Sequence, residues 1–498
     1  MLFNSVQFLI FFPIVVLCYY MLPAKVRYLW LLAASYFFYM CWNASYALLM
    51  LFSTAVTYIG GLLLEKIKDT HWDVQRKEIC KKCCVVGSFV INLSVLFWFK
   101  YFNFAVQNIN LAMHAFQVEV NLPKVDILLP VGISFYTFQA LGYTMDVYRD
   151  EIRAEKNFFR YALFVSFFPQ LVAGPIERSK NLLYQLRIPA KFQAKKARWG
   201  LLTMAWGLFL KLVIADNIAP LVDSFYAEAE EHTAMALLTV TILFAFQIYC
   251  DFQGYTQLAI GSAIVLGIRI NENFDTPYLA GSVKDFWHRW HISLTSWFTD
   301  YLYIPLGGSR KGKFRKQLNT MIVFLCSGLW HGAAWHYIVW GGVNGLLSIA
   351  EDLARPLYHK LVSVLRIKEQ CVMWKIFRTA VTFILVDITW LFFRADSLGQ
   401  GYGLLKRFVL EFHPLWFFSE GFPNMFGTTE NFMIILFSLF ILFGIDFLKY
   451  RGIDMRAVIF GQQIVFRWLI YWVIFLIILF WGAYGTGYEQ KQFIYFQF

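Results

Sequence analysis

Long apolar runs alternate with short polar connections along the whole chain. Clear runs cover residues 6–21, 46–64, 85–104, 236–270, 432–448 and 464–484. Each is about as long as a helix that crosses the hydrocarbon core of a bilayer. The strict alternation of a membrane β-barrel is missing. The pattern therefore predicts an all-α, polytopic integral membrane protein with roughly ten to twelve helical segments.

Two segments interrupt this pattern with proline, glycine and polar residues in apolar surroundings, namely 129–138 and 168–176. Irregular backbone survives at membrane depth only where protein or a wet cavity buries it. We therefore expect broken helices here, with a re-entrant element over 158–176. Residues 319–350 lie between basic flanks. They predict a hairpin or another re-entrant element, with His331 near its turn or midpoint.

The composition supports a membrane protein and excludes an ordinary soluble domain. Of the 498 residues, 59% are hydrophobic and only 15% are charged. The net charge of +12 would suit nucleic-acid binding, but the basic residues gather in connections at 66–82, 178–198 and 310–316. Because this is the positive-inside pattern of cytoplasmic loops, we expect the bilayer and no nucleic acid as a partner. The acidic connection at 223–231 and both termini are expected outside.

No linker, low-complexity tract or internal repeat divides the chain. We expect one membrane domain over 1–498, with N-terminal helices in 1–125, a core that carries the candidate site in 126–350 and C-terminal helices in 351–498. The first apolar run lacks the basic start and the cleavage site of a signal peptide, so it is expected to be retained. The cysteine cluster at 80–84 lacks further zinc ligands at suitable spacing, which favours reduced cytosolic thiols.

Four histidines in apolar, aromatic surroundings are the main candidates for chemistry. His331 and His336 lie in one such stretch, and His288 and His291 lie in another upstream. An ionisable side chain at membrane depth is costly and tends to be kept for function. An imidazole that aromatic walls keep neutral is ready to accept a proton from a hydroxyl.

His331 is the candidate general base. The competing interpretation is a structural histidine within a helix packing, and the residues alone weigh the two about evenly. Gly332 favours the chemical role, because a glycine lets another backbone or a ligand approach the ring. His291 would orient the reacting group or tune His331, or it is a polar group on the wet face of an interfacial helix over 282–297. In that helix His288 and His291 would share a face.

Metal binding and phosphate binding are also weighed. The four histidines could in principle meet around a metal, but there is no HExxH motif and no carboxylate partner beyond Asp285, so we predict no metal. Arg310 and Lys311 follow a Gly-Gly-Ser turn that could hold phosphates, although positive-inside topology explains them and is preferred. Asp251 is an intramembrane carboxylate. It is expected to pair with a histidine or an arginine, or to satisfy a helix interface.

Several ordered segments together resemble the membrane-bound O-acyltransferases, and within them the branch of the membrane subunit of alginate O-acetyltransferase. They are residues 129–138, 168–178, 247–255, 273–278, 285–293, 301–308, 330–332 and 493–498. The resemblance extends over nearly the whole chain. It implies helices around a central tunnel, and acyl transfer from a cytoplasmic thioester to a hydroxyl that ends up outside.

In this resemblance His331 looks like the characteristic histidine of the family, and His291 like its second polar position. Supporting residues would be His288, His336, Asp251, Trp330 and Asn273. Arg310 and Lys311 would contact the donor. The resemblance implies no permanently bound cofactor, because acetyl-CoA would be the acyl donor and thus a substrate.

The resemblance also implies partners and a location. The partners are the bilayer, the acyl donor, a glycan acceptor and an extracytoplasmic acetyltransferase protein, and the location is the cytoplasmic (inner) membrane of a bacterium. A hydrolase is disfavoured because no nucleophile elbow with a Ser-His-Asp triad is visible. One rival is D-alanyl transfer from a carrier protein to teichoic acid, which the chain length and residues 493–498 disfavour. The other is a transporter or channel built on the broken segments.

Overall fold

The computed structural model describes residues 1–118, 121–172, 174–485 and 493–496. Every regular element in these residues is helical, which confirms the all-α prediction. Seven helical stretches are long and apolar enough to cross a membrane: Ala44–Lys68, Val74–Ala115, Ala194–Ala227, Ala234–Val265, Val372–Arg394, Thr429–Tyr450 and Ile464–Trp481. The helices, α1 to α22, outnumber the predicted segments because several segments are broken into short helices. The chain is a polytopic membrane protein.

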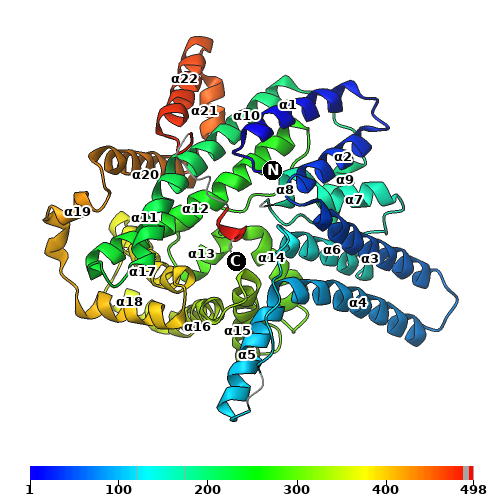
Figure 1. The fold of residues 1–498 in the computed structure, drawn as a ribbon, viewed down its shortest axis with the longest axis horizontal. Helices are drawn as coiled ribbons and strands as arrows, with labels where there is room; N and C mark the ends of the chain where they lie inside the picture. The colour runs from blue at the N-terminus through cyan, green and yellow to red at the C-terminus, as the bar shows by residue number, and fades with distance from the viewer. Residues whose placement is uncertain (119–120, 173, 486–492, 497–498) are drawn as a thin grey trace. The chain divides into compact units, whose positions relative to one another are not determined.

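The chain divides into two compact units. Figure 1 labels the helices that make them up. The first unit comprises Met1–Met204 with Leu258–Asn271, and the second comprises Ala205–Gln257 with Glu272–Phe498. The first unit contains α1 (Val6–Met21), α2 (Arg27–Met40), α3 (Ala44–Lys68), α4 (Val74–Leu96), α5 (Phe102–Ala115), α6 (Ile133–Tyr148), α7 (Phe158–Ser166), α8 (Phe168–Leu171) and α9 (Ser179–Leu186). Two further helices, α10 (Ala194–Leu208) and α12 (Ala234–Val265), contribute residues to both units.

Local signals start several helices of the first unit where the apolar runs begin. The side chain of Asn43 accepts a hydrogen bond from the backbone N–H of Ser45 at the start of α3. Asp73 does the same for Arg76 at the start of α4. These side chains satisfy backbone donors that have no partner within the first turn. The first predicted run, 6–21, coincides with α1.

The broken backbone expected over 158–176 is confirmed in the described residues, because two short helices, α7 and α8, end at Ser166 and Leu171. That this segment enters and leaves the membrane on one side stays a prediction. Buried side chains satisfy the interrupted backbone. The Gln139 amide donates to the Phe164 carbonyl at 2.5 Å, and the Ser35 hydroxyl accepts from the Phe168 N–H at 3.1 Å. A broken helix is stable at this depth because the surrounding protein replaces the missing backbone hydrogen bonds.

The second unit holds the remaining helices. They are α11 (Asp216–Ala227), α13 (Val283–Arg289), α14 (Ile292–Phe298), α15 (Lys313–His331), α16 (Trp335–Val364), α17 (Val372–Arg394), α18 (Leu398–Leu410), α19 (Gly421–Asn424), α20 (Thr429–Tyr450), α21 (Met455–Gly461) and α22 (Ile464–Trp481). A π-helical stretch, η2 (Phe209–Ala215), precedes α11, and a short 3-10 helix, η6 (Ile494–Phe496), lies near the C-terminus.

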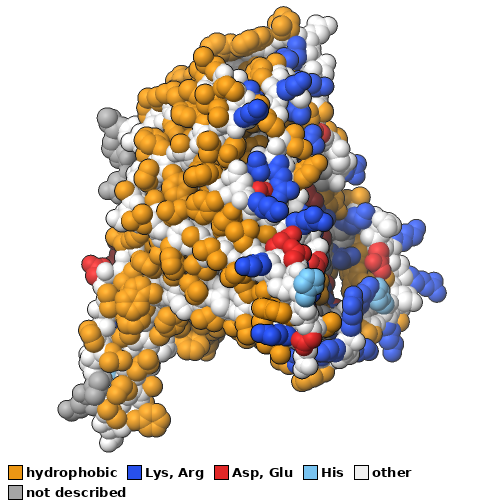
Figure 2. Space-filling view, turned by 90° about the vertical axis from the view of Figure 1, so that its right-hand side faces the viewer, with side chains coloured by type: hydrophobic (Ala, Val, Ile, Leu, Met, Phe, Trp, Pro, Cys, Tyr) orange, Lys and Arg blue, Asp and Glu red, His pale blue; other side chains and the backbone are white. Residues whose placement is uncertain are grey.

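Apolar side chains dominate the surface, as a bilayer requires. Hydrophobic side chains cover most of the face drawn in Figure 2, where Lys and Arg gather in a limited area. In the second unit, none of the apolar window of α22 is buried within the protein. A soluble monomer rarely exposes so large an apolar surface, so these faces are suited to contact lipid.

The predicted hairpin over 319–350 is confirmed by α15 and α16, which pack against each other across a short turn. Glycines permit the close approach. A Cβ atom on Gly328 would lie 2.3 Å from the backbone oxygen of Tyr337, and one on Gly341 would lie 2.3 Å from a carbonyl of α15. His331 is the last residue of α15, at the turn, and its exposed fraction is 3%.

The single interfacial helix expected over 282–297 is wrong. α13 ends at Arg289 and α14 begins at Ile292, because the backbone between them turns extended and then left-handed. The break places His291 in the interior and leaves His288 exposed. The two histidines therefore do not share a helix face.

Candidate active site

His291 stands at the break between α13 and α14, with a φ of 44° in the left-handed region. Asn273 holds this turn through two hydrogen bonds, one to its backbone oxygen and one to its side chain. Its backbone oxygen accepts from the Ile292 N–H at 2.9 Å, and its side-chain Oδ1 accepts from the Ser293 N–H at 3.3 Å. The imidazole is 1% exposed and packs edge-on to Phe252, with 4.7 Å between ring centroids. Asn273 thus fixes the backbone that aims His291 inward.

His331 reaches the same interior from the end of α15. Its ring lies 5.0 Å from Trp340 and 5.6 Å from Phe393, measured between centroids. A Cβ atom on Gly332 would lie 2.1 Å from the ring of Tyr337. The glycine next to His331 is therefore needed to admit the Tyr337 ring, rather than another backbone or a ligand.

The structure brings His331 and His291 together. Their ring centroids are 6.4 Å apart. Trp330 lies beside both, at 5.0 Å from His331 and 5.8 Å from His291. Tyr495 completes the enclosure, at 5.4 Å from His331 and 6.2 Å from His291. It belongs to the C-terminal segment, which here means residues 493–496. The two imidazoles thus share one aromatic enclosure, which we call the histidine chamber. Its residues come from α12, the break before α14, the hairpin of α15 and α16, α17 and the C-terminal segment.

Burial sets the charge state of His291. Because water is excluded from the ring, the pKa of His291 is lowered to about 3, so the imidazole is neutral near pH 7. A neutral imidazole can donate one hydrogen bond and accept another without bringing charge into the chamber. With His331 beside it as the proton acceptor, the two imidazoles form a pair suited to acid–base catalysis on a hydroxyl.

The C-terminal segment is held in place by Asp251 of α12. The Oδ2 atom of Asp251 accepts a hydrogen bond from the Ile494 N–H at 2.7 Å. Its Oδ1 atom lies 2.7 Å from the Nζ of Lys211, which also lies 2.8 Å from Asp216. The prediction of a histidine or arginine partner for Asp251 is wrong, because the partner is a lysine from η2. The alternative, that Asp251 satisfies a helix interface, agrees with this contact between α12 and η2. Phe493 packs 4.7 Å from Tyr255 and helps to anchor the same segment.

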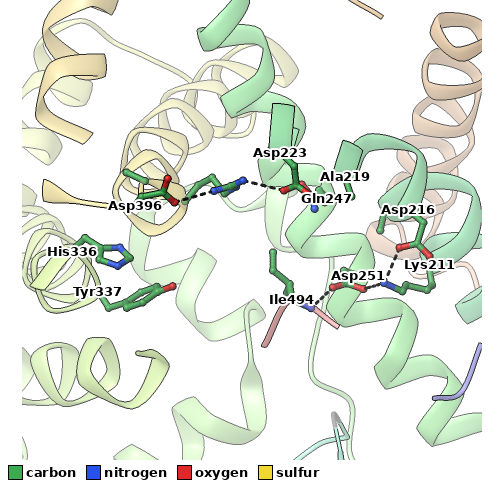
Figure 3. A pocket seen from close by; sticks show the side chains of 13 residues that line it. Lys211, Asp216, Ala219, Asp223, Gln247, Asp251, His336, Tyr337, Asp396 and Ile494 are labelled. Carbon is green, nitrogen blue, oxygen red and sulfur yellow. Dashed lines mark hydrogen bonds and ion pairs between the residues drawn. The ribbon is translucent and has the colours of Figure 1, made fainter. Parts of the chain in front are cut away.

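A cavity of about 290 Å³ lies next to this anchor. Its lining residues are Lys211, Ala215, Asp216, Ala219, Asp223, Gln247, Asp251, His336, Tyr337, Arg394, Ala395, Asp396 and Ile494. Figure 3 shows two clusters in which one cation contacts two carboxylates. Lys211 contacts Asp216 and Asp251, and Arg394 lies 3.0 Å from Asp223 and 3.7 Å from Asp396. Two of the lining residues are neighbours of the histidine pair along the chain or in space: Ile494 precedes Tyr495, and the ring of Tyr337 packs against Gly332.

The other predicted site residues lie elsewhere. His336 lines the cavity and not the chamber; its Nδ1 is 3.2 Å from the Phe392 carbonyl, and burial lowers its pKa. His288, Arg310 and Lys311 are exposed, so the structure does not bring them to the histidine pair. Among the described residues, no group of three or more His, Cys, Asp or Glu side chains is placed to hold a metal ion.

Lys211, Tyr495 and Tyr337 are the residues that sequence reasoning missed. Lys211 is a single cation in the apolar stretch 208–214, and the cost of burying a charge would have singled it out as it did the histidines. Tyr495 lies in a segment whose resemblance was noted, but nothing local indicates that its ring contacts His331. Nothing in the sequence around Tyr337 indicates its position except Gly332, the glycine that makes room for its ring.

Comparison with known proteins identifies relatives. Residues 28–393 match the profile of a family described as MBOAT, membrane-bound O-acyltransferase family. The chain is 38% identical over 400 residues to "Probable alginate O-acetylase AlgI" of Azotobacter vinelandii, a match covering 80% of this chain and 76% of that protein. It is 33% identical over 442 residues to "Peptidoglycan O-acetyltransferase" of Helicobacter pylori, covering 82% of this chain and 80% of that protein.

A more distant relative matches only part of the chain. "Teichoic acid D-alanyltransferase" of Streptococcus thermophilus is 30% identical over 241 residues, which cover 45% of this chain and 56% of that protein. The O-acetyltransferases are thus similar over most of the chain and the D-alanyltransferase over less than half.

Proposed function

This chain belongs to the membrane-bound O-acyltransferase family, and from that premise we propose that it moves an acetyl group from acetyl-CoA on the cytoplasmic side to hydroxyls of an envelope or extracellular polysaccharide. It is a multi-pass membrane enzyme of the O-acetyltransferase type. The donor, the side from which the donor enters and the acceptor belong to the proposal. The observation that carries it is the chamber shared by His331 and His291.

The proposed chemistry uses His331 as the base. Its imidazole takes the proton of the acceptor hydroxyl while the hydroxyl oxygen attacks the thioester carbonyl carbon. The C–S bond then breaks, and the proton held by the imidazole passes to the departing thiolate. His291, neutral at the working pH, would donate a hydrogen bond to the carbonyl oxygen as negative charge develops there. The aromatic walls of Trp330 and Tyr495 would exclude water, which would otherwise hydrolyse the thioester.

The proposal includes a protein partner outside the membrane. The second unit offers a polar cavity lined in part by Asp251 and Ile494. We expect an extracytoplasmic acetyltransferase protein to accept the acyl group and carry it to the glycan. Arg310 and Lys311, exposed on the turn before α15 and not beside the histidine pair, would attract the phosphates of the donor to this turn by charge.

The test compares cell-surface glycans from cells that carry the parent protein and cells that carry His331→Ala. We expect ester-linked acetyl groups, measured by mass spectrometry, to be lost with His331→Ala while the variant remains in the membrane. Removing a positioned general base typically costs a factor of about 10²–10⁴. His359→Ala is the matched control, because His359 is an exposed histidine on α16. Unchanged acetylation in His331→Ala would refute the proposal.

The same experiment separates the rival functions. Loss of D-alanyl esters in place of acetyl esters would assign the activity of the teichoic acid relatives. A transporter would still move its substrate after the loss of His331, so surviving flux with no ester change on any glycan would favour that class. Acetyl esters that depend on His331 contradict both rivals.

A further inference from the structure

The first unit contains a second cavity, far from any histidine of the chamber in sequence and unconnected with the proposed chemistry. Its volume is about 340 Å³. The end of α1 and the start of α2 line it together with α7 and the residues that follow α9. Four lining residues are cationic: Lys25, Arg27, Arg160 and Arg187. None of the described lining residues is acidic.

Arg27 is fixed in this cavity without a carboxylate. Its guanidinium donates to the backbone carbonyls of Leu22, Ala190 and Tyr20 at 3.0, 2.6 and 3.2 Å. It also lies over the ring of Tyr19, at 5.3 Å from the centroid. Carbonyl dipoles and a tyrosine face hold the group in position but leave its full charge available to a ligand.

The other two arginines share a single carboxylate. Arg160 and Arg187 lie 3.2 and 2.8 Å from Glu155, whose side chain is 5% exposed. Arg160 also lies over Tyr28, at 5.4 Å from the ring centroid. Four cations against one carboxylate leave three positive charges around one cavity. Such an excess attracts an anion, and arginine in particular matches the oxygens of a phosphate.

The helix whose end lines the cavity also exposes an apolar face. Tyr19 lines the cavity from the buried side of α1, and the outward residues of the same helix are strongly exposed, from 51% for Ile14 to 81% for Met21. Met21 is followed closely in the chain by Ala24 and Lys25, which line the cavity, so the exposed face ends near it. A ligand that combines a phosphate with long apolar chains would satisfy both surfaces at once, and a phospholipid is such a ligand.

We propose that this cavity binds the headgroup of an anionic phospholipid, with the acyl chains along the exposed face of α1. The positive-inside rule accounts for an excess of basic residues in the connections between these helices. It does not explain why three arginines and a lysine from distant segments converge on one cavity with a single carboxylate among them. The proposal does not depend on the acyl-transfer function.

The test measures lipid retention by the purified full-length protein. The protein is equilibrated in mixed micelles of phosphatidylglycerol and phosphatidylethanolamine, and bound lipid is counted by native mass spectrometry. We expect phosphatidylglycerol to be retained selectively, and Lys25→Gln with Arg187→Gln to weaken it roughly thirtyfold, from about 1 kcal/mol for each charge lost. Lys191→Gln with Lys195→Gln is the matched control, since both lysines are exposed in the same basic stretch but outside the cavity lining.

Two results would overturn the proposal. Equal retention of the two lipids, or an equal loss in the Lys191 and Lys195 control, would show that general surface charge attracts the lipid. Displacement of the lipid by millimolar inorganic phosphate or coenzyme A would assign the cavity to a soluble phosphate compound instead. The thermal stability of each variant in detergent is measured alongside, so that a misfolded variant is recognised. If the double variant is unstable, Lys25→Gln alone, at an exposed position, gives the same comparison with about a fivefold effect.

Discussion

Replacing Lys211 by methionine should destabilise the second unit and detach the C-terminal segment. The three side chains of the cluster are almost fully buried: Lys211 and Asp216 are 1% exposed and Asp251 is 5% exposed. Methionine fills a similar volume but brings no charge, so two carboxylates would remain in the interior without their cation. Breaking a buried ion pair from one side typically costs about 3–5 kcal/mol. We expect a loss of this size in the free energy of unfolding.

The functional consequence follows from the second contact of Asp251. A carboxylate that must be neutralised or moved is a poorer acceptor for the Ile494 N–H, and Tyr495 is the next residue along the chain. We therefore expect the ring of Tyr495 to leave the histidine chamber and acyl transfer to fall with it. Asp251→Ala should act in the same way. Asp216→Asn is the matched control, because within the described residues both carboxylates contact Lys211, whereas it is Asp251 that accepts the Ile494 N–H.

Two assays separate the effects. Unfolding in detergent reports stability, and alkylation of a cysteine placed at Ile494, read by peptide mapping, reports whether the segment is released. The parent Ile494 is 5% exposed, so its cysteine should be protected. Protection should be lost with Asp251→Ala and kept with Asp216→Asn. A Lys211→Met protein within about 1 kcal/mol of the parent would refute the argument from burial. A protected segment in an inactive Lys211→Met protein would refute the link to Tyr495.

Two further predictions concern other parts of the chain. Burial raises the pKa of Glu177 to about 7 from an ordinary 4.5, so the folded protein binds a proton that the unfolded chain has lost, and stability should fall by roughly 3 kcal/mol as the pH rises from 4.5 through 7. Thermal unfolding of the parent and of Glu177→Gln across this range measures it, and parallel curves would contradict it. Gly332→Ala places a Cβ atom 2.1 Å from the ring of Tyr337 and should cost about 1–3 kcal/mol while displacing His331. Unfolding and transfer assays measure both effects, and a stable, active Gly332→Ala enzyme would contradict the packing that we describe.

The hydrophobic pattern predicted the helices well where the length and polarity of a single segment determine the structure. The run at 6–21 coincides with α1, and basic flanks around 319–350 indicated the hairpin of α15 and α16 with His331 at its turn. In both cases length and polarity along the chain decide the outcome. The buried, broken helices at 158–176 were also predictable, because proline and glycine in an apolar run have few stable solutions in a membrane.

Features that depend on distant segments were not predictable in the same way. The break at His291 is fixed by hydrogen bonds to Asn273, which precedes it in the chain by a whole helix. The partner of Asp251 comes from η2, and one wall of the chamber comes from Tyr495 near the C-terminus. Periodicity carries no information about such pairings. The apolar surroundings indicated four histidines, and the family resemblance selected His331 and His291 among them. Neither indicated the neighbours that enclose the two rings.

Because the backbone at His291 is left-handed, a residue at this position must meet a conformational requirement as well as a chemical one. Any replacement there is judged by its ability to occupy a φ of 44° as well as by its chemistry. Asparagine tolerates this conformation better than other non-glycine residues, whereas valine or isoleucine does not. A collection of variants at this site would therefore mix folding defects with catalytic ones. Asparagine is the substitution that removes the imidazole while sparing the turn, and it is the one from which a loss of activity can be interpreted.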